Sequence, residues 1–202
     1  MGDIVQKKEK TKKLTVKDLI YAGAFAAIYL IAVLAIMMLV GTVPILYVLC
    51  PTILGVLLGS IYLLSVTKIK KFGAALIIEL LFACISTGFD PIAFSVCVIS
   101  ALLAEICILI GKYKSKFWYA FSYVFFNIGT AANFIRIFFA KDAYIENLQK
   151  RAGGAFADGM IKLLSPCWSW IMIIGLAVIG GIAGAFIASK LIKKHFEKAE
   201  IV

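Results

Sequence analysis

The sequence predicts an all-α membrane protein, with six transmembrane helices in one bundle and with the N- and C-termini cytoplasmic. The 202 residues are 63% hydrophobic, and their mean hydropathy is +1.01. Several apolar segments approach or exceed the roughly 20 residues that cross a hydrocarbon core of ~30 Å. A soluble domain does not carry so much apolar sequence, and each such segment satisfies its own backbone hydrogen bonds in lipid by forming a helix.

The basic residues indicate the orientation of the bundle. The net charge is +10, and most of the 21 Lys and Arg residues lie in the tails or in two short connections. These groups are Lys7, Lys8, Lys10, Lys12, Lys13 and Lys17; Lys68, Lys70 and Lys71; Lys112, Lys114 and Lys116; and Lys190, Lys193, Lys194 and Lys198. The positive-inside rule assigns them to the cytoplasmic side of the cell membrane. This placement favours the lipid bilayer, and not nucleic acid, as the partner of the charge.

The positions of the basic groups divide the chain into three parts: a basic cytoplasmic tail at 1–15, a six-helix domain at 16–192 and a cytoplasmic tail at 193–202. The first span is expected at 16–40, which is too long for the apolar region of a cleavable signal peptide. The second, at 44–66, is opened by the uncharged connection "GTVPILYVLCP". The third, at 72–88, follows the basic "KIKK".

The last three spans are marked by proline, glycine and charge. The fourth is expected at 91–111, because Pro91 suits a first helical turn. The fifth, at 117–140, follows the basic "GKYKSK". The sixth, at 166–191, is preceded by Ser165, a suitable N-cap.

The connection at 141–165 is predicted to be external, and it is long and mixed in charge. Asp142 suits the cap of a short helix ending at Gly153, and Asp158 suits the cap of another. Two interpretations are open: a solvated loop, or a lid over an outward-facing site, since long ordered loops are often binding loops.

Two carboxylates and an amide form the predicted intramembrane polar cluster. Glu79 and Glu105 lie about 12 and 10 Å from the inner ends of the third and fourth spans, counted along the helix axis. Asn127 on the fifth span is placed to reach either one. Such groups are expensive in lipid and usually face a partner or a cavity. The cluster is either a proton or cation site, or a structural link between helices, which we favour because no third carboxylate or histidine joins it.

A second polar group is predicted near the outer end of the fifth span. Arg136, Asn133 and Thr130 share one helix face, and the guanidinium fork suits a ligand with a carboxylate, phosphate or amide. Alternatively, Arg136 extends to the outer headgroups. Asp90, Trp168 and Trp170 are expected at the same level, where the tryptophans either stack on a flat ligand or belong to an aromatic belt. These six residues are the candidate ligand site.

Small residues four positions apart mark the cytoplasmic half of the first span. Ala22 with Ala26, and Gly23 with Ala27, form two adjacent copies of the small-x-x-x-small pattern, which lets helices approach closely in lipid. Similar faces occur on the second and sixth spans at Gly55, Gly59, Gly180, Gly181, Gly184, Ala185, Ala188 and Ser189. The first span is expected to pack either on the sixth or on another protein.

The six spans, the cytoplasmic tails and the Ala22-x-x-x-Ala26 motif resemble the S component of an energy-coupling factor (ECF) transporter. The runs "KDAYIENLQKRAG" and "IGGIAGAFIASKLIKKHF" are similar, more narrowly, to the Trep_Strep group of S components. The resemblance implies that a small vitamin or other micronutrient binds in the outer half. It also implies that Ala22 and Ala26 dock on a T subunit, with two ATPase subunits driving transport. Asn133, Arg136 and Trp168 are ligand candidates by location only.

No catalytic, metal or cofactor site is expected. The chain lacks a P-loop motif, so ATP would be used by partner subunits. It also lacks a nucleophile–base pair, and its five cysteines contain no C-x-x-C. Two rivals to the S-component hypothesis stay open: a self-sufficient proton-coupled carrier using Glu79 and Glu105, and a membrane scaffold without a ligand.

Overall fold

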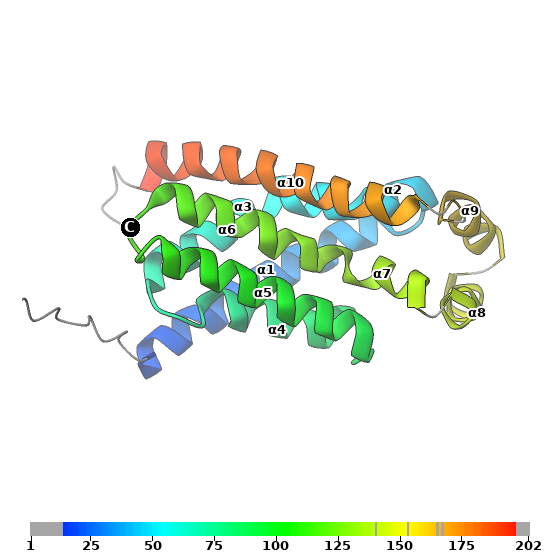
Figure 1. The fold of residues 1–202 in the computed structure, drawn as a ribbon, viewed down its shortest axis with the longest axis horizontal. Helices are drawn as coiled ribbons and strands as arrows, with labels where there is room; N and C mark the ends of the chain where they lie inside the picture. Colours follow the sequence, from blue (N-terminus) through cyan, green and yellow to red (C-terminus); the bar gives the residue numbers. More distant parts are fainter. Residues whose placement is uncertain (1–13, 140, 153, 165, 167, 197–202) are drawn as a thin grey trace, which may run out of the picture.

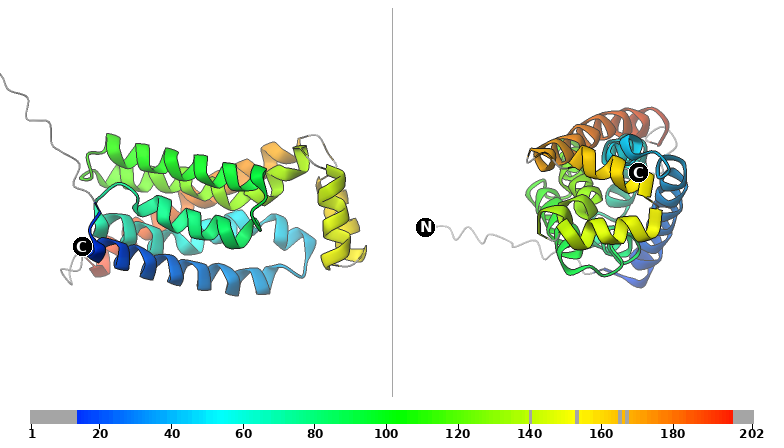
Figure 2. Two further views of the ribbon diagram at one scale, coloured as in Figure 1. Left: turned by 90° about the horizontal axis from the view of Figure 1, so that it is seen from below. Right: turned by 90° about the vertical axis from the view of Figure 1, so that its right-hand side faces the viewer.

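The structure is a computed structural model, and it describes residues 14–139, 141–152, 154–164, 166 and 168–196. Within these ranges the chain is helical and contains no strand. The long helices run side by side as an elongated bundle, and two short helices lie across one end of it (Figures 1 and 2). The expectations for 1–13, for 197–202 and for an N-cap at Ser165 fall outside the described residues.

The first helix, α1, spans Val16–Val40, as the sequence predicts. Its start is set by a capping box. The Asp18 carboxylate accepts hydrogen bonds from the backbone N–H of Thr15 at 2.7 Å and from its hydroxyl at 2.6 Å, and the Thr15 hydroxyl accepts from the Asp18 N–H. This exchange satisfies backbone donors that the first helical turn leaves unpaired.

The predicted second span is two helices, a short α2 at Pro44–Val48 and a long α3 at Cys50–Ile69. Pro51 lies in the first turn of α3, where its missing N–H costs nothing. The third and fourth spans are α4 at Ala74–Ser86 and α5 at Pro91–Ile110, with Asp90 as the N-cap of α5.

The predicted fifth span is a helix with an interruption. It comprises α6 at Lys116–Ile128, a 3₁₀ turn η1 at Gly129–Ala131, and α7 at Ala132–Phe139. The break lies where Glu79 of α4 approaches Gly129 so closely that a Cβ atom at Gly129 would overlap the carboxylate. The glycine is therefore required by a tertiary contact.

The external connection contains α8 at Lys141–Ala152 and α9 at Gly154–Leu164. The expected cap at Asp158 is wrong, because this residue lies inside α9, which begins at Gly154. The last helix, α10, spans Ser169–Leu191 and continues into a π-helical turn, η2, at Ile192–Phe196.

Among the described residues, four helices are long and apolar enough to cross a membrane by themselves: α1, α3, α5 and α10. The 13 residues of α4 extend only about 20 Å at 1.5 Å per residue. The segment from α6 through α7 passes the same test only together with the helix that follows it, beyond a sharp bend. The chain is thus a multi-pass all-helical membrane protein, and the six-span topology stays a prediction.

The closest helix packing in the bundle joins α3 to α10. A Cβ atom on Gly55 would lie 2.6 Å from the backbone of Gly180, and one on Gly59 would lie 2.8 Å from the carbonyl of Gly184. These glycines are needed for that approach. Helix α1 packs on α3 and α4, so the alternative in which it packs on the last helix is wrong, and packing on another protein stays a prediction.

Candidate functional site

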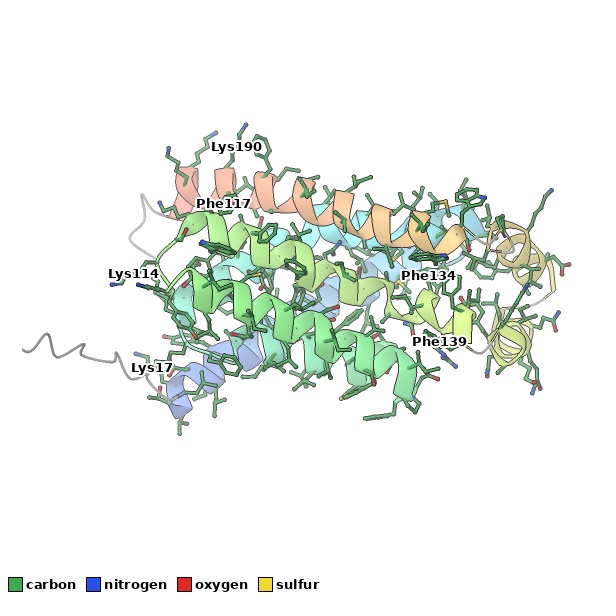
Figure 3. The ribbon with its side chains drawn as sticks, viewed as in Figure 1. Lys17, Lys114, Phe117, Phe134, Phe139 and Lys190 are labelled. Carbon is green, nitrogen blue, oxygen red and sulfur yellow. The ribbon has the colours of Figure 1, made fainter. Side chains whose placement is uncertain are left out.

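The two ends of the bundle differ in chemistry. Lys17, Lys114 and Lys190 lie at one end, and Phe134 and Phe139 lie at the other, next to α8 and α9 (Figure 3). The connections 70–73 and 111–115, the start of α1 and the end of α10 are also at the basic end (Figure 1). The basic connections of the sequence thus lie together at one end of the folded protein.

The predicted ligand strip on α7 faces the turn between α4 and α5. The Asn133 side-chain N–H donates to the carbonyl of Ser86 at 3.0 Å. One turn further along α7, the Arg136 Nε lies 3.1 Å from the Asp90 Oδ2. Asn133, Arg136 and Asp90 therefore lie along one contact between α7 and the α4–α5 turn, as their predicted common level suggests.

The α4–α5 turn has an unusual backbone at the point where it presents Asp90. Gly88 and Phe89 both have positive φ, at 57° and 62°. Left-handed conformation is uncommon for a residue with a bulky side chain. Asp90 then leaves this turn in extended conformation, and its Oδ1 accepts the N–H of Ala93 at 3.0 Å. One carboxylate oxygen is used for the helix cap, and the other faces Arg136.

Arg136 is held in an ion pair without a hydrogen bond. Its side chain is 22% exposed, and that of Asp90 is 20% exposed. The Nε atom is buried and lacks a hydrogen-bond partner among the described residues, since its approach to Asp90 is misaligned. Tyr144 of α8, a buried residue, lies within electrostatic range of this guanidinium. The arginine thus lies between the start of α5 and the helices that cover the end.

Thr130 and the two tryptophans lie away from this contact. The Thr130 hydroxyl is buried in η1 and donates to the Asn127 carbonyl at 2.7 Å. Trp168 is 60% exposed and Trp170 is 43% exposed, with the Trp170 ring edge-on to Phe138 at 6.3 Å. The arrangement fits the aromatic-belt interpretation better than stacking on a ligand beside Arg136.

Helices α8 and α9 cover the end of the bundle at which α7, the helix of Arg136, ends (Figures 1 and 2). Tyr47 of α2 contacts Phe134 of α7, with ring centres 5.2 Å apart, and Phe156 of α9 at 5.9 Å. Gly159 of α9 packs so closely on Pro44 that a Cβ atom there would lie 2.7 Å from the proline ring. We call α8 and α9 together the cap.

Beneath the cap lies an apolar layer. The buried residues of this layer are Val48, Ala131, Phe134, Ile137, Tyr144, Met160, Leu164, Ile173 and Ala177. A small hollow between α7, α8 and α9 is lined by Ile137, Lys141, Tyr144, Ile145, Leu148, Met160, Ile161 and Leu164. This hollow is too small for a nutrient-sized ligand.

Sequence reasoning missed Tyr144, Tyr47 and Phe134 as residues of this end. Tyr144 is an isolated aromatic residue within a charged stretch, and this was the available signal. In the fold its side chain is only 8% exposed. Pro44 and Gly159 gave a weaker signal, because only their contact shows that α2 supports the cap.

The predicted cluster of Glu79, Glu105 and Asn127 is dispersed over three separate contacts. The Glu105 Oε1 accepts the N–H groups of Gly73 at 2.9 Å and Ala75 at 2.8 Å. It thereby caps the start of α4. This carboxylate also reinforces the effect of burial on Tyr113, outside the helices, and the two raise the pKa of that hydroxyl to about 12.

Asn127 and Glu79 contact different helices. The Asn127 side-chain N–H groups donate to the carbonyls of Pro51 at 3.0 Å and Ala177 at 2.7 Å, so this amide ties α6 to α3 and α10. Glu79 is fully buried beside Gly129 and Cys97, and neither of its oxygens has a well-aligned hydrogen bond from a described residue. The predicted link through Asn127 to either carboxylate is not formed.

The two small-residue pairs on α1 point in different directions. Ala22 and Ala26 are 0% exposed and belong to the main core, against α3 and α4. Gly23 has open space where a Cβ atom would lie, and Ala27 is exposed. In this conformation only the second pair presents a surface to another molecule, and docking through Ala22 and Ala26 stays a prediction.

Metal and thiol chemistry add no site within the part of the chain that the structure describes. No group of three or more His, Cys, Asp or Glu side chains there is arranged to hold a metal ion. Cys50, Cys84, Cys97 and Cys107 are free thiols.

Comparison with known proteins gives a family for this helical architecture. No curated protein and no solved structure matches the chain. A family model described as "Hypothetical bacterial integral membrane protein (Trep_Strep)" matches residues 16–198. That range includes all helices from α1 through η2. The chain therefore belongs to the Trep_Strep family of bacterial integral membrane proteins.

Proposed function

We propose that this chain is the substrate-binding membrane subunit of an ECF-type importer. In this role it captures a small water-soluble vitamin or micronutrient from outside and delivers it to a T subunit driven by two ATPase subunits. The observation that carries the proposal is the opposite character of the two bundle ends. One end has the paired polar residues Arg136 and Asp90 beneath the cap, and the other has lysines and an exposed small-residue face on α1.

The ligand would enter at the capped end. Asn133 and Arg136 offer N–H donors from one face of α7, and Asp90 faces them from the start of α5. The cap closes over this end through Tyr47 and Phe156. A site of this design excludes water only when closed, so capture requires α8 and α9 to move as a lid. Both chain ends would be cytoplasmic, and ATP would be bound only by the partner subunits.

Docking would use the outward pair on α1. Gly23 and Ala27 leave a shallow strip near the basic end, with the exposed Ala24 between them. Close approach of backbones is the main source of helix association in lipid. A coupling helix of a T subunit fits against such a strip without displacing large side chains. Burial of Ala22 and Ala26 in the core supports docking through their neighbours Gly23 and Ala27.

Co-purification with a T subunit and ATPase subunits tests the proposal. The double substitution Gly23→Trp, Ala27→Trp is expected to leave a folded, monodisperse protein that no longer assembles. The matched control is Ile179→Trp, at a position 59% exposed on α10, which is expected to assemble normally. A folded double variant that still assembles contradicts docking through α1. Failure of the unmodified chain to assemble with any T subunit contradicts the proposed function.

A proton-coupled carrier is the second candidate, and Glu79 is the observation in its favour, because this carboxyl is fully buried without a well-aligned donor. Glu105 supports it less, since three backbone N–H groups donate to its Oε1. Uptake by the purified chain alone in liposomes, driven by a pH gradient and lost in Glu79→Gln, would favour the carrier. A scaffold without a ligand would show neither uptake nor a ligand-induced thermal shift.

A further inference from the structure

The ion pair between Arg136 and Asp90 has a geometry that leaves the arginine incompletely satisfied. The closest approach is from Nε to Oδ2 at 3.1 Å, yet it is not aligned as a hydrogen bond. A guanidinium carries five N–H donors in a planar fork, which matches a carboxylate or a phosphate through two parallel hydrogen bonds. Asp90 neutralises the charge of Arg136 but does not form two parallel hydrogen bonds with it.

Asp90 has a second attachment that does not involve Arg136. Its Oδ1 accepts the N–H of Ala93 and caps α5. Release of the other oxygen from Arg136 therefore leaves the aspartate anchored and the start of α5 intact. Each side chain of the pair also retains about a fifth of its surface exposed, so an ion can reach the pair without unfolding the bundle.

We propose that Asp90 is an exchangeable counter-ion, and that an oxyanion group of the ligand, a carboxylate or a phosphate, displaces its Oδ2 from Arg136. The incoming group forms the two-pronged contact that Asp90 lacks. Asp90 then competes with the ligand, which lowers affinity for weak anions and selects those with a planar or tetrahedral oxyanion. The inference rests on the proposed function for the identity of its ligand as a nutrient.

The chain is suited to a direct test because it contains two arginines, Arg136 and Arg151. Purified full-length protein with ¹⁵N-labelled arginine gives two Nε signals, and Arg151→Lys assigns them. Benzoate and inorganic phosphate serve as probe anions in maltoside detergent, which lacks phosphate. We expect either anion to shift the Arg136 signal and to slow its exchange with water. The signal of Arg136→Gln disappears, and that variant shows no anion-induced thermal shift.

Asp90→Asn is the decisive variant. Asparagine is as good an N-cap as aspartate, so α5 keeps its start while the competing charge is lost. We expect the probe anion to bind about tenfold more tightly to this variant, the scale of a removed close charge competitor. Glu146→Gln is the matched control, since it removes a carboxylate from an exposed ion pair with Lys150 in the cap. That variant is expected to bind the anion as the unmodified chain does.

Two outcomes overturn the inference: an Arg136 signal that responds to neither anion in any variant, or equal anion affinity in Asp90→Asn and the unmodified chain. Assembly with a T subunit together with either of these results leaves the proposed function standing and the counter-ion role refuted. Anion exchange without assembly refutes the proposed function alone. Repeating the measurement in phosphatidylcholine nanodiscs identifies the source of the oxyanion, because a shift already present without added anion assigns it to lipid headgroups.

Discussion

Replacing Glu105 by alanine should be among the most destabilising single changes in the bundle. Its Oε1 accepts two short hydrogen bonds, at 2.9 Å from the N–H of Gly73 and at 2.8 Å from the N–H of Ala75. Hydrogen bonds to a charged group contribute roughly 1.5–3 kcal/mol each. Loss of both therefore lowers the free energy of unfolding by about 3–6 kcal/mol and leaves two buried donors at the start of α4 without a partner.

Glu105→Gln keeps an acceptor oxygen but removes its charge. Charge-assisted hydrogen bonds are about twice as strong as neutral ones, so this variant should lose roughly half as much free energy of unfolding as the alanine variant. Glu79→Gln is the matched comparison, because no described residue donates a well-aligned hydrogen bond to Glu79. That substitution should cost less than about 1 kcal/mol.

Denaturant or thermal unfolding of the purified protein in one detergent measures all three variants. The predicted order of cost is Glu105→Ala, then Glu105→Gln, then Glu79→Gln. A Glu105→Ala variant that loses less than about 1 kcal/mol would refute the capping role. Equal losses for the two glutamine variants would contradict a capping role that Glu105 has and Glu79 lacks.

Two further predictions concern glycine contacts. Gly180→Ala should destabilise the bundle by about 1–3 kcal/mol in the same unfolding assay, the cost of overpacking, because the new Cβ would lie 2.6 Å from the backbone of Thr52. Gly175→Ala is the control on the same helix, with open space at its Cβ position, and should cost little. Gly159→Val should loosen the cap at Pro44, which faster hydrogen exchange confined to α8 and α9 would report. Unchanged exchange in the cap would contradict that contact.

The helices of this protein are predictable from its sequence because capping residues, prolines and lysine runs mark their ends. Thr15 with Asp18 forms the capping box that starts α1, and Asp90 before Pro91 starts α5. Lysine runs end or begin the spans at the basic end. Each of these signals acts within a few residues of the boundary, so no knowledge of tertiary contacts is needed to read it.

The break between α6 and α7 was not predictable, because its cause lies on another helix. The segment from Lys116 to Phe139 is apolar almost throughout, and a lone glycine in a membrane helix is common. Only the fold shows that Gly129 lies against the Glu79 carboxylate. The same limit applied to the two small-residue pairs of α1. Their spacing is identical, and only packing shows that Ala22 faces inward and Gly23 outward.

The sequence predicted the position of the candidate-site residues along the bundle axis, but not the contacts of their side chains. Counting along the helices placed Asp90 and Arg136 at one end, and they are indeed paired. The same count placed Trp168 there, yet its side chain lies mostly on the outside. Depth along a helix follows from residue number, whereas the direction of a side chain around the helix depends on which neighbours it packs against.

Helix α7 connects the proposed anion exchange to movement of the cap. It has eight residues, and the 3₁₀ turn at its start separates it from α6. One face carries Arg136, which is paired with the start of α5, and another carries Phe134 and Ile137, which belong to the apolar layer under the cap. A ligand that draws Arg136 away from Asp90 therefore also shifts the side chains on which the cap rests. Binding of the ligand and closure of the cap would then be coupled through two turns of one helix.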